Sequence, residues 1–196
     1  MLDILRKKSL ILITLLTLIL WTGLCPPLAL PQENPTTWEV YFSPHGECTS
    51  AIVRELNKAK NSILVQAYYL TSVPIAEALL NAFDKGVKVE VILDKSQRTN
   101  GLIASLCDKG IQVKIDITRG IAHNKVMIID GEIVITGSFN FTKAAEEKNA
   151  ENLLVIHDKK LASLYTKNWR EREKHSDAYI KSGVTKAGQV SQQLPH

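Results

Sequence analysis

The chain has 196 residues, 45% of them hydrophobic and 22% charged, which allows one sizeable core and one domain once the N-terminal segment is set aside. Its 24 basic and 20 acidic residues give a net charge of +4, and residues 1–30 hold three of the basic and one of the acidic residues, leaving 21 against 19, or +2. So moderate a charge excludes a protein that binds nucleic acid through overall charge alone.

Residues 1–30 are predicted to be an export signal or a membrane anchor. Arg6 to Lys8 precede an uncharged run at 9–25, and prolines from Pro26 onward interrupt any continuation. The run is shorter than a typical membrane-spanning helix of about 20 residues, which favours a cleaved signal. We therefore expect an exported protein, periplasmic or secreted, or alternatively one attached to a membrane through residues 9–25. Cys25 follows a leucine rather than a small residue, which argues against lipidation.

After a linker at 31–37, strand and helix patterns alternate through a predicted domain at 38–176. The expected strands lie at 38–42, 62–70, 87–94, 112–116, 121–130, 133–139 and 153–157, and the expected helices at 49–60, 75–85, 101–109 and 159–174. This alternation predicts an α/β sandwich with a mixed central sheet flanked by helices.

The last predicted helix carries an apolar stripe formed by Leu161, Leu164, Tyr165 and Trp169. We interpret this stripe as part of the core rather than as a platform for stacking bases. The polar tail at 177–196 is expected to be disordered.

The strands at 121–130 and 133–139 are separated by a turn signal and are predicted to form a β-hairpin. His123 and Lys125 are two residues apart and so project from one face of their strand, whereas Asp130 projects from the other. Asp130 is therefore expected to have a structural role.

The register of this hairpin depends on which two residues form its loop. A loop at 130–131 places His123 opposite Ser138, and a loop at 131–132 places His123 opposite Asn140. Either register gathers these polar side chains and Lys125 on one face.

These side chains suit a phosphate group. Lys125 supplies a positive charge, Ser138 and Asn140 supply neutral donors, and Gly137 would let a ligand approach the backbone closely. His123 is the reactive group, because a neutral imidazole can attack phosphorus or carry a proton.

The chain resembles the phospholipase D superfamily at two motifs, His123-x-Lys125-x4-Asp130 and Gly137-Ser138-Phe139-Asn140. The run at 137–146 is especially similar to the small bacterial endonucleases of that family, and the resemblance extends from about Val40 to about Arg172.

The resemblance implies hydrolysis of a phosphodiester through a covalent phosphohistidine on His123, with no cofactor and no metal. Family members use two such histidines and this chain has one copy of the motif, so a homodimer is implied. Lys125, Ser138 and Asn140 match the phosphate-binding positions. Glu151 matches the glutamate that orients the histidine, which also makes it the candidate carboxylate for fixing the tautomer of His123.

Three substrate interpretations follow. Four basic residues sit in predicted loops at strand ends or beside the motif, where they could contact a nucleic-acid backbone: Lys95, Arg98, Arg119 and Lys143. With no interleaved aromatic cluster, they favour a nonspecific endonuclease acting on DNA and possibly RNA. The alternatives are a membrane-anchored phospholipase of the cardiolipin-hydrolase kind and a non-catalytic nucleic-acid-binding module. The lack of an evident apolar surface element favours the nuclease.

The remaining cysteines and histidines carry no predicted chemistry. Cys48 and Cys107 could form a disulfide or remain two buried free thiols on helices. We expect three further histidines to be surface or structural residues: His45, His157 and His175.

Overall fold

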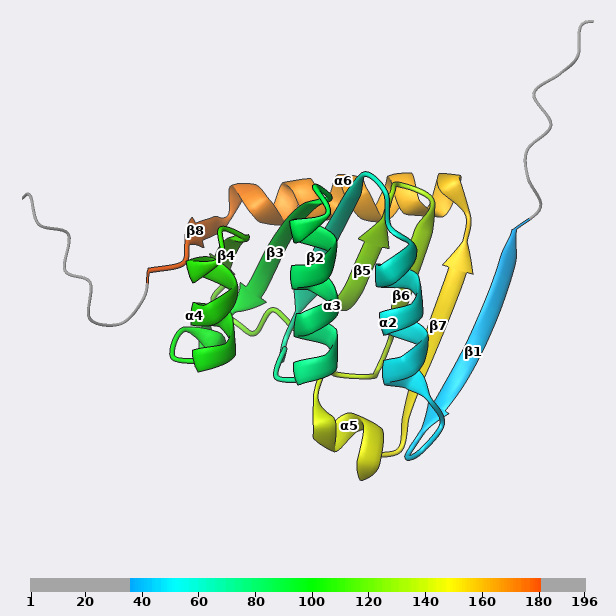
Figure 1. Ribbon diagram of the computed structural model, residues 1–196. Coiled ribbons are helices and arrows are strands. Elements are labelled where there is room, and N and C mark those ends of the chain that lie inside the picture. Colours follow the sequence, from blue (N-terminus) through cyan, green and yellow to red (C-terminus); the bar gives the residue numbers. More distant parts are fainter. Residues whose placement is uncertain (1–35, 181–196) are drawn as a thin grey trace, which may run out of the picture. The chain divides into compact units, whose positions relative to one another are not determined.

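The computed structural model describes residues 36–180, so the predictions for residues 1–30, most of the linker and the end of the tail lie outside the described residues. An eight-stranded sheet with the order β1-β7-β6-β5-β2-β3-β4-β8 runs through the domain (Figure 1). The strands are β1 (Thr37–Ser43), β2 (Ser62–Ala67), β3 (Lys88–Asp94), β4 (Gln112–Asp116), β5 (Lys125–Ile129), β6 (Ile133–Gly137), β7 (Glu151–His157) and β8 (Ser176–Ala178).

The sheet is mixed, because β2 pairs in parallel with β3 and β3 with β4, while every other pair is antiparallel. The helices are α2 (Cys48–Lys58), α3 (Val73–Asp84), α4 (Gly101–Asp108), α5 (Lys143–Glu147) and α6 (Lys159–Lys174), with a 3-10 turn, η1 (Lys95–Gln97). The α/β sandwich predicted from the sequence is confirmed.

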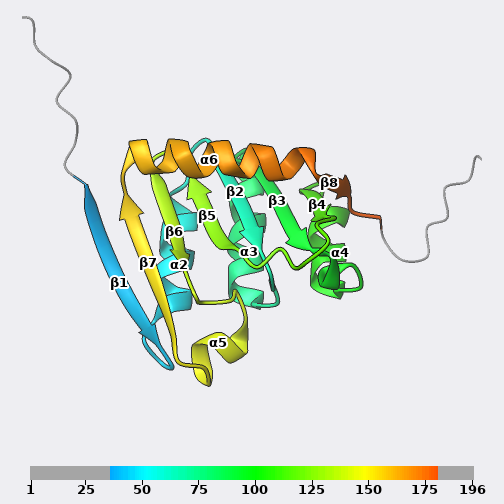
Figure 2. The same cartoon turned by 180° about the vertical axis from the view of Figure 1, so that it is seen from behind.

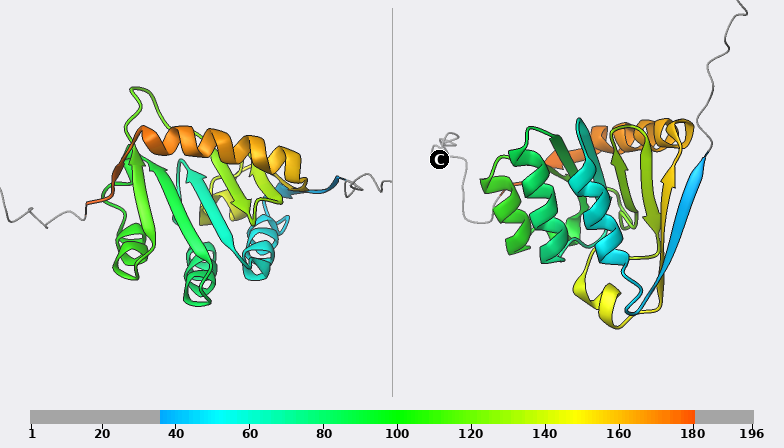
Figure 3. Two further views of the ribbon diagram at one scale, coloured as in Figure 1. Left: turned by 90° about the horizontal axis from the view of Figure 1, so that it is seen from above. Right: turned by 45° about the vertical axis from the view of Figure 1, so that its right-hand side comes forward.

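The helices lie in two layers. The three helices α2, α3 and α4 cover one face of the sheet, and α6 crosses the other face alone (Figures 2 and 3). Buried Val, Ile, Leu and Ala side chains fill the space between the sheet and the three helices. A smaller apolar cluster lies under α6, where the indole Nε1 of Trp169 donates a hydrogen bond of 2.9 Å to the carbonyl of Val65.

One member of the predicted core stripe of α6 is misplaced. Trp169 is buried, and Leu161 and Tyr165 pack against the cluster under α6. Leu164 is 64% exposed, so the prediction that it belongs to the core is wrong. The stripe is narrower than the sequence suggested because a single helix on a sheet buries only the side chains that face the strands.

Two elements are absent from the sequence prediction. The strand β8 was assigned from residue 177 onward to a disordered tail, but it pairs with β4 and satisfies backbone groups on that edge of the sheet. The side chain of Arg172 at the end of α6 binds Asp116 of β4, which brings the following residues alongside β4. The helix α5 has five residues, and Thr142 caps its start by accepting a hydrogen bond from the Ala145 amide at 3.1 Å.

Candidate active site

The β5–β6 hairpin has a register that differs from both predicted ones. Asp130 and Gly131 have positive φ, and the Glu132 amide donates to the Ile129 carbonyl at 3.0 Å, which is the geometry of a tight two-residue turn. The ladder nevertheless pairs Ile129 with Ile133, so Glu132 is an extra residue. Both predicted registers are wrong because each assumed a hairpin without a bulge.

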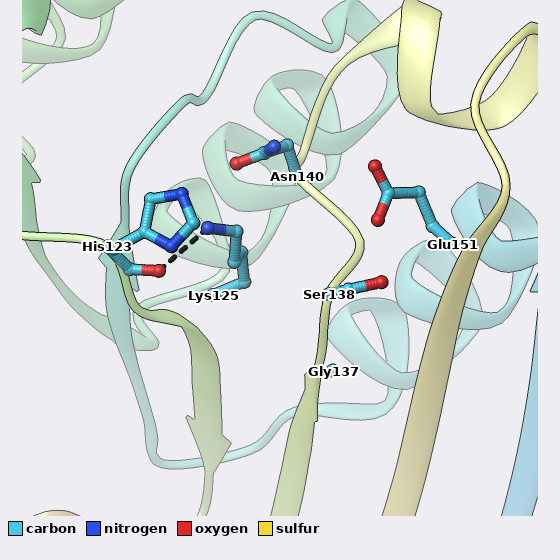
Figure 4. A pocket seen from close by; sticks show the side chains of 6 residues that line it. All are labelled: His123, Lys125, Gly137, Ser138, Asn140 and Glu151. Atoms are coloured by element: carbon cyan, nitrogen blue, oxygen red, sulfur yellow. Dashed lines mark hydrogen bonds between the residues drawn. The ribbon is translucent and has the colours of Figure 1, made fainter.

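The structure nevertheless brings the predicted polar residues together. A pocket of about 300 Å³ opens at the edge of the sheet where β6 ends and β5 and β7 begin (Figure 4). Six residues line it: His123, Lys125, Gly137, Ser138, Asn140 and Glu151. Asp130 is not among them.

His123 lies in the loop that precedes β5 rather than in the predicted strand, and it is exposed. Two backbone contacts hold this loop: the Ala122 amide donates to the buried carboxylate of Asp94 at 2.7 Å, and the Tyr68 amide donates to the Asn124 carbonyl at 2.9 Å. The imidazole of His123 packs against the ring of Tyr68, with 4.7 Å between the ring centroids. The position of His123 is therefore set largely by residues outside the hairpin.

Asp94 and Tyr68 are residues that the sequence analysis missed. Burial would raise the pKa of the Asp94 carboxyl, but hydrogen bonds from the Ser96 and Ala122 amides, with the charge of Lys95, lower it. Asp94 therefore acts as a charged acceptor that holds a loop end. The available signal was its place at the end of a predicted buried strand, which is typical of site residues in α/β sheets.

Lys125 is buried, and its Nζ donates to the carbonyl oxygen of His123 at 2.7 Å (Figure 4). Burial lowers the pKa of the Lys125 ammonium, and the nearby carboxylate of Glu151 opposes that shift. An ammonium held in this way presents its remaining N–H donors to the pocket.

Ser138 is fixed by the backbone of β7. Its Oγ accepts a hydrogen bond from the Asn152 amide at 3.1 Å, and the amides of Ser138 and Phe139 both donate to the Asn152 carbonyl, at 3.1 and 3.2 Å. Since the hydroxyl accepts from the backbone, its own hydrogen is free to point to a ligand.

The structure requires a glycine at position 137 for a reason other than the predicted ligand access. Its φ is +149°, and a Cβ at this position would lie 2.2 Å from the carbonyl oxygen of Asn152. The glycine is therefore required by the close approach of β6 to β7, which also creates the Ser138 contacts. The pocket gains its shape as a consequence.

Asn140 carries an unsatisfied buried atom. Its Oδ1 is buried and has no hydrogen-bond partner among the residues that the structure describes. The side chain points into the pocket beside His123 and Lys125 (Figure 4). A buried acceptor without a partner is costly, and the Nδ2 of the same amide is the atom that can donate to a phosphate oxygen.

Glu151 begins β7 and lines the pocket on the side away from His123 (Figure 4). Its Oε1 accepts a hydrogen bond from Asn149 Nδ2 at 3.2 Å. Among the hydrogen bonds of residues 36–180, none joins Glu151 to His123. The orienting contact expected for this glutamate is therefore not made within one copy of the chain.

Asp130 lies at the far end of β5 from the pocket. Its carboxylate accepts three backbone hydrogen bonds, from the amides of Lys60, Asn61 and Ser62 at 2.9, 2.7 and 2.9 Å. These contacts join the hairpin to the turn between α2 and β2.

The other candidate residues lie as follows. The Nζ of Lys95 donates to the carbonyls of Thr118 and Arg119 at 3.1 Å, so this lysine ties two loops together. The Nζ of Lys143 forms an ion pair with the Oε1 of Glu147 on α5, at 3.5 Å. The side chains of Arg98 and Arg119 are exposed.

His45 and His175 are exposed, and His157 is half-buried at the end of β7. Cys48 and Cys107 are both free thiols, on α2 and α4, and no disulfide joins them. Burial, together with the charge of Glu146, raises the pKa of the Cys48 thiol to about 11.

Across residues 36–180 there is no cluster of three or more His, Cys, Asp or Glu side chains that could hold a metal ion. In the same range, no helix has the length and apolar character needed to cross a membrane.

Comparison with known proteins decides the family. Residues 52–172 match the family described as cardiolipin synthase, PLD-like domain. The chain belongs to the phospholipase D superfamily. Within this superfamily it is 47% identical over 151 residues to a phospholipase D of Rickettsia prowazekii, covering 76% of this chain and 72% of that protein. It is 42% identical over 154 residues to a phospholipase D of Rickettsia typhi, covering 78% and 76%.

The fold agrees with this assignment. The crystal structure of Nuc, a phospholipase D family member from Salmonella typhimurium, superimposes with a TM-score of 0.70 at 37% identity, over 74% of this chain and 99% of that one. The chain is thus a phosphodiesterase of the phospholipase D superfamily.

Proposed function

We propose that the protein hydrolyses phospholipid phosphodiesters without a metal ion, as a phospholipase D. The observation that carries this proposal is the pocket itself: His123, Lys125, Ser138, Asn140 and Glu151 converge in a chain that is up to 47% identical to proteins named phospholipase D. The sequence predicted nucleic acid as the substrate, and besides the relatives there is one structural reason to favour lipid instead.

That reason is an apolar stripe on the edge strand β1. Three alternate side chains, Trp38, Val40 and Phe42, are 64%, 40% and 64% exposed. Phe42 lies opposite Asn152, the residue whose backbone holds Ser138, so the stripe runs up to the wall of the pocket. The argument for a nuclease from the lack of an apolar surface therefore fails, and aromatic side chains beside the pocket suit a lipid surface.

The chemistry follows from the side chains. A nitrogen of the His123 imidazole attacks phosphorus, forming a P–N bond while the P–O bond to the head-group alcohol breaks. Lys125, Ser138 and Asn140 bind the non-bridging oxygens, on which negative charge must be stabilised. Water then attacks phosphorus, breaks the P–N bond and releases phosphatidic acid.

Two proton transfers need a group other than the attacking imidazole. The leaving oxygen must receive a proton, and the attacking water must lose one. Within residues 36–180, the pocket holds no second histidine. We propose that His123 of a second copy supplies this acid and base in a homodimer, and that Glu151 finds its histidine partner across that interface.

The decisive experiment is an assay of the full chain on cardiolipin or phosphatidylcholine vesicles and on plasmid DNA, with EDTA present. We expect phosphatidic acid to be released from either lipid, and His123→Ala to abolish this activity. His157→Ala is the matched control, because it removes a histidine outside the pocket. Loss of lipid hydrolysis in EDTA with recovery on adding magnesium would contradict the mechanism.

Nucleic acid is the second candidate substrate. The observation that favours it is the pair of exposed arginines Arg98 and Arg119, of which Arg119 lies four residues before His123. Cleavage of plasmid DNA without release of phosphatidic acid would select this candidate. Binding of DNA with no cleavage of either substrate would leave the non-catalytic module.

Export through residues 1–30 is part of the proposal and would bring the enzyme to lipids outside the cytoplasm.

A further inference from the structure

The imidazole of His123 has one aromatic neighbour among the described residues. The ring of Tyr68 lies against it, with 4.7 Å between centroids and an angle of 57° between the ring planes. No hydrogen bond of residues 36–180 reaches the imidazole nitrogens. Since the side chain is exposed and makes no such bond, the ring contact with Tyr68 restricts its rotation.

The same tyrosine also touches the phosphate-binding lysine. The Nζ of Lys125 lies 5.2 Å from the centroid of the Tyr68 ring, within the range of a cation–π interaction. Lys125 Nζ in turn donates to the carbonyl oxygen of His123. The three side chains therefore form one group, with Tyr68 contacting both residues that would act on phosphorus.

Tyr68 is itself held from two sides. It follows the last residue of β2, Ala67, which is buried and pairs with Lys125, and its amide donates to the Asn124 carbonyl at 2.9 Å. The ring of Tyr69 packs edge-on against it, at 4.3 Å between centroids. A hydrogen bond with Tyr69 raises the pKa of the Tyr68 phenol. The ring is thus anchored on both its backbone and its side chain.

We propose that Tyr68 is a positioning residue for phosphoryl transfer: its ring holds the imidazole of His123 and the ammonium of Lys125 in the mutual arrangement that attack on phosphorus needs. This inference rests on the proposed function, since it requires His123 to be the nucleophile. A nucleophile free to rotate loses attack geometry, and small displacements reduce rates by large factors.

A positioning role and a substrate-binding role make different predictions. A residue that only orients His123 and Lys125 affects the chemical step, so its loss lowers kcat and leaves KM nearly unchanged. A residue that stacks on the substrate affects KM. The aromatic ring, rather than the hydroxyl, makes the contacts with His123 and Lys125, so phenylalanine should replace the tyrosine.

The test uses the full chain and bis(4-nitrophenyl) phosphate, a soluble phosphodiester that is neither lipid nor nucleic acid. We expect Tyr68→Leu to lower kcat about tenfold or more at constant KM, and Tyr68→Phe to stay close to wild type. Tyr165→Leu is the matched control, because Tyr165 is another half-buried tyrosine that packs under α6. Melting temperatures of all variants are measured alongside.

A second readout does not depend on the leucine variant folding. In NMR spectra of the wild type and of Tyr68→Phe, the aromatic ring at position 68 should shift the His123 side-chain proton resonances away from the values of a free histidine. An unshifted His123 resonance, or a Tyr68→Leu variant with wild-type kcat or a changed KM alone, would overturn the inference. If His123→Ala is inactive in these assays, the proposed function survives that result; if His123→Ala retains activity, both proposals fall.

Discussion

At the scale of single residues, the pocket works through groups whose charge state is set by their surroundings. Lys125 is the clearest case, because burial lowers the pKa of its ammonium while Glu151 opposes that shift. A lysine binds phosphate strongly only when it is protonated. As the pH rises, Lys125 should therefore lose its proton, and phosphate binding should weaken, before the pH reaches 10.5, the ordinary pKa of lysine. The carboxylate across the pocket therefore extends the working pH range upward.

A direct prediction follows for Glu151→Gln. Removing the negative charge leaves burial unopposed, so the titration midpoint of Lys125 should move to lower pH. The measurement is an NMR titration of the Lys125 side chain in both proteins. Glu147→Gln removes an exposed carboxylate on α5 outside the pocket and should leave the midpoint where it is. A midpoint that is unchanged or higher in Glu151→Gln would refute this account of the electrostatics.

Residue types were easier to predict than the reasons for them. The sequence placed His123, Lys125, Ser138 and Asn140 together through period-two alternation in a register that the structure does not have. They meet instead because β6 ends where β5 begins. Gly137 was assigned to ligand access, whereas its missing side chain makes room for the Asn152 carbonyl. That contact joins β6 to β7 at long range, and no local pattern in the sequence specifies it.

At the scale of elements, the hairpin owes its place to contacts outside itself. The predicted registers failed because one extra residue, Glu132, shifts the ladder, and a bulge has no firm sequence signature. The strand β8 was missed because three residues give too short a pattern. It forms through its pairing with β4, beside the Arg172–Asp116 ion pair. The long, strongly periodic helices and buried strands were predicted close to their observed bounds.

Asp130 should matter to stability rather than to chemistry. Its carboxylate accepts from the amides of Lys60, Asn61 and Ser62 at the end of β5 that is remote from the pocket. Asp130→Ala leaves these donors without their acceptor, and we expect a loss of about 1–3 kcal/mol in the free energy of unfolding. Urea unfolding measures this loss, and kcat of the folded fraction should stay near wild type.

The control for Asp130 lies in the same turn. Glu132 pairs with Lys159 through an exposed ion pair of 2.7 Å, with side chains 54% and 68% exposed, so Glu132→Ala should change stability by less than about 1 kcal/mol. An Asp130→Ala protein with wild-type stability and no activity would show that the aspartate acts in the reaction.

At the scale of the whole molecule, the proposed reaction needs more groups than the pocket of one chain supplies. Within residues 36–180, the pocket has one histidine, its glutamate makes no hydrogen bond with that histidine, and hydrolysis through a phosphohistidine needs both a nucleophile and a proton donor. The proposed homodimer would supply both the second histidine and a partner for the glutamate. It also implies that a mixed dimer with one His123 lacks either the nucleophile or the acid at each step.

Mixing wild-type and His123→Ala chains tests this arrangement. If two His123 side chains serve one reaction, an equal mixture after subunit exchange should retain about a quarter of the wild-type activity, because only dimers of two wild-type chains are competent. If each chain works alone, the mixture should retain about half. The assay is run across the full range of mixing ratios. In the control, His157→Ala replaces His123→Ala, and the activity of the mixture should stay at the wild-type level at every ratio. A linear decline with the wild-type fraction would rule out a site shared between two copies, and a quadratic decline would require it.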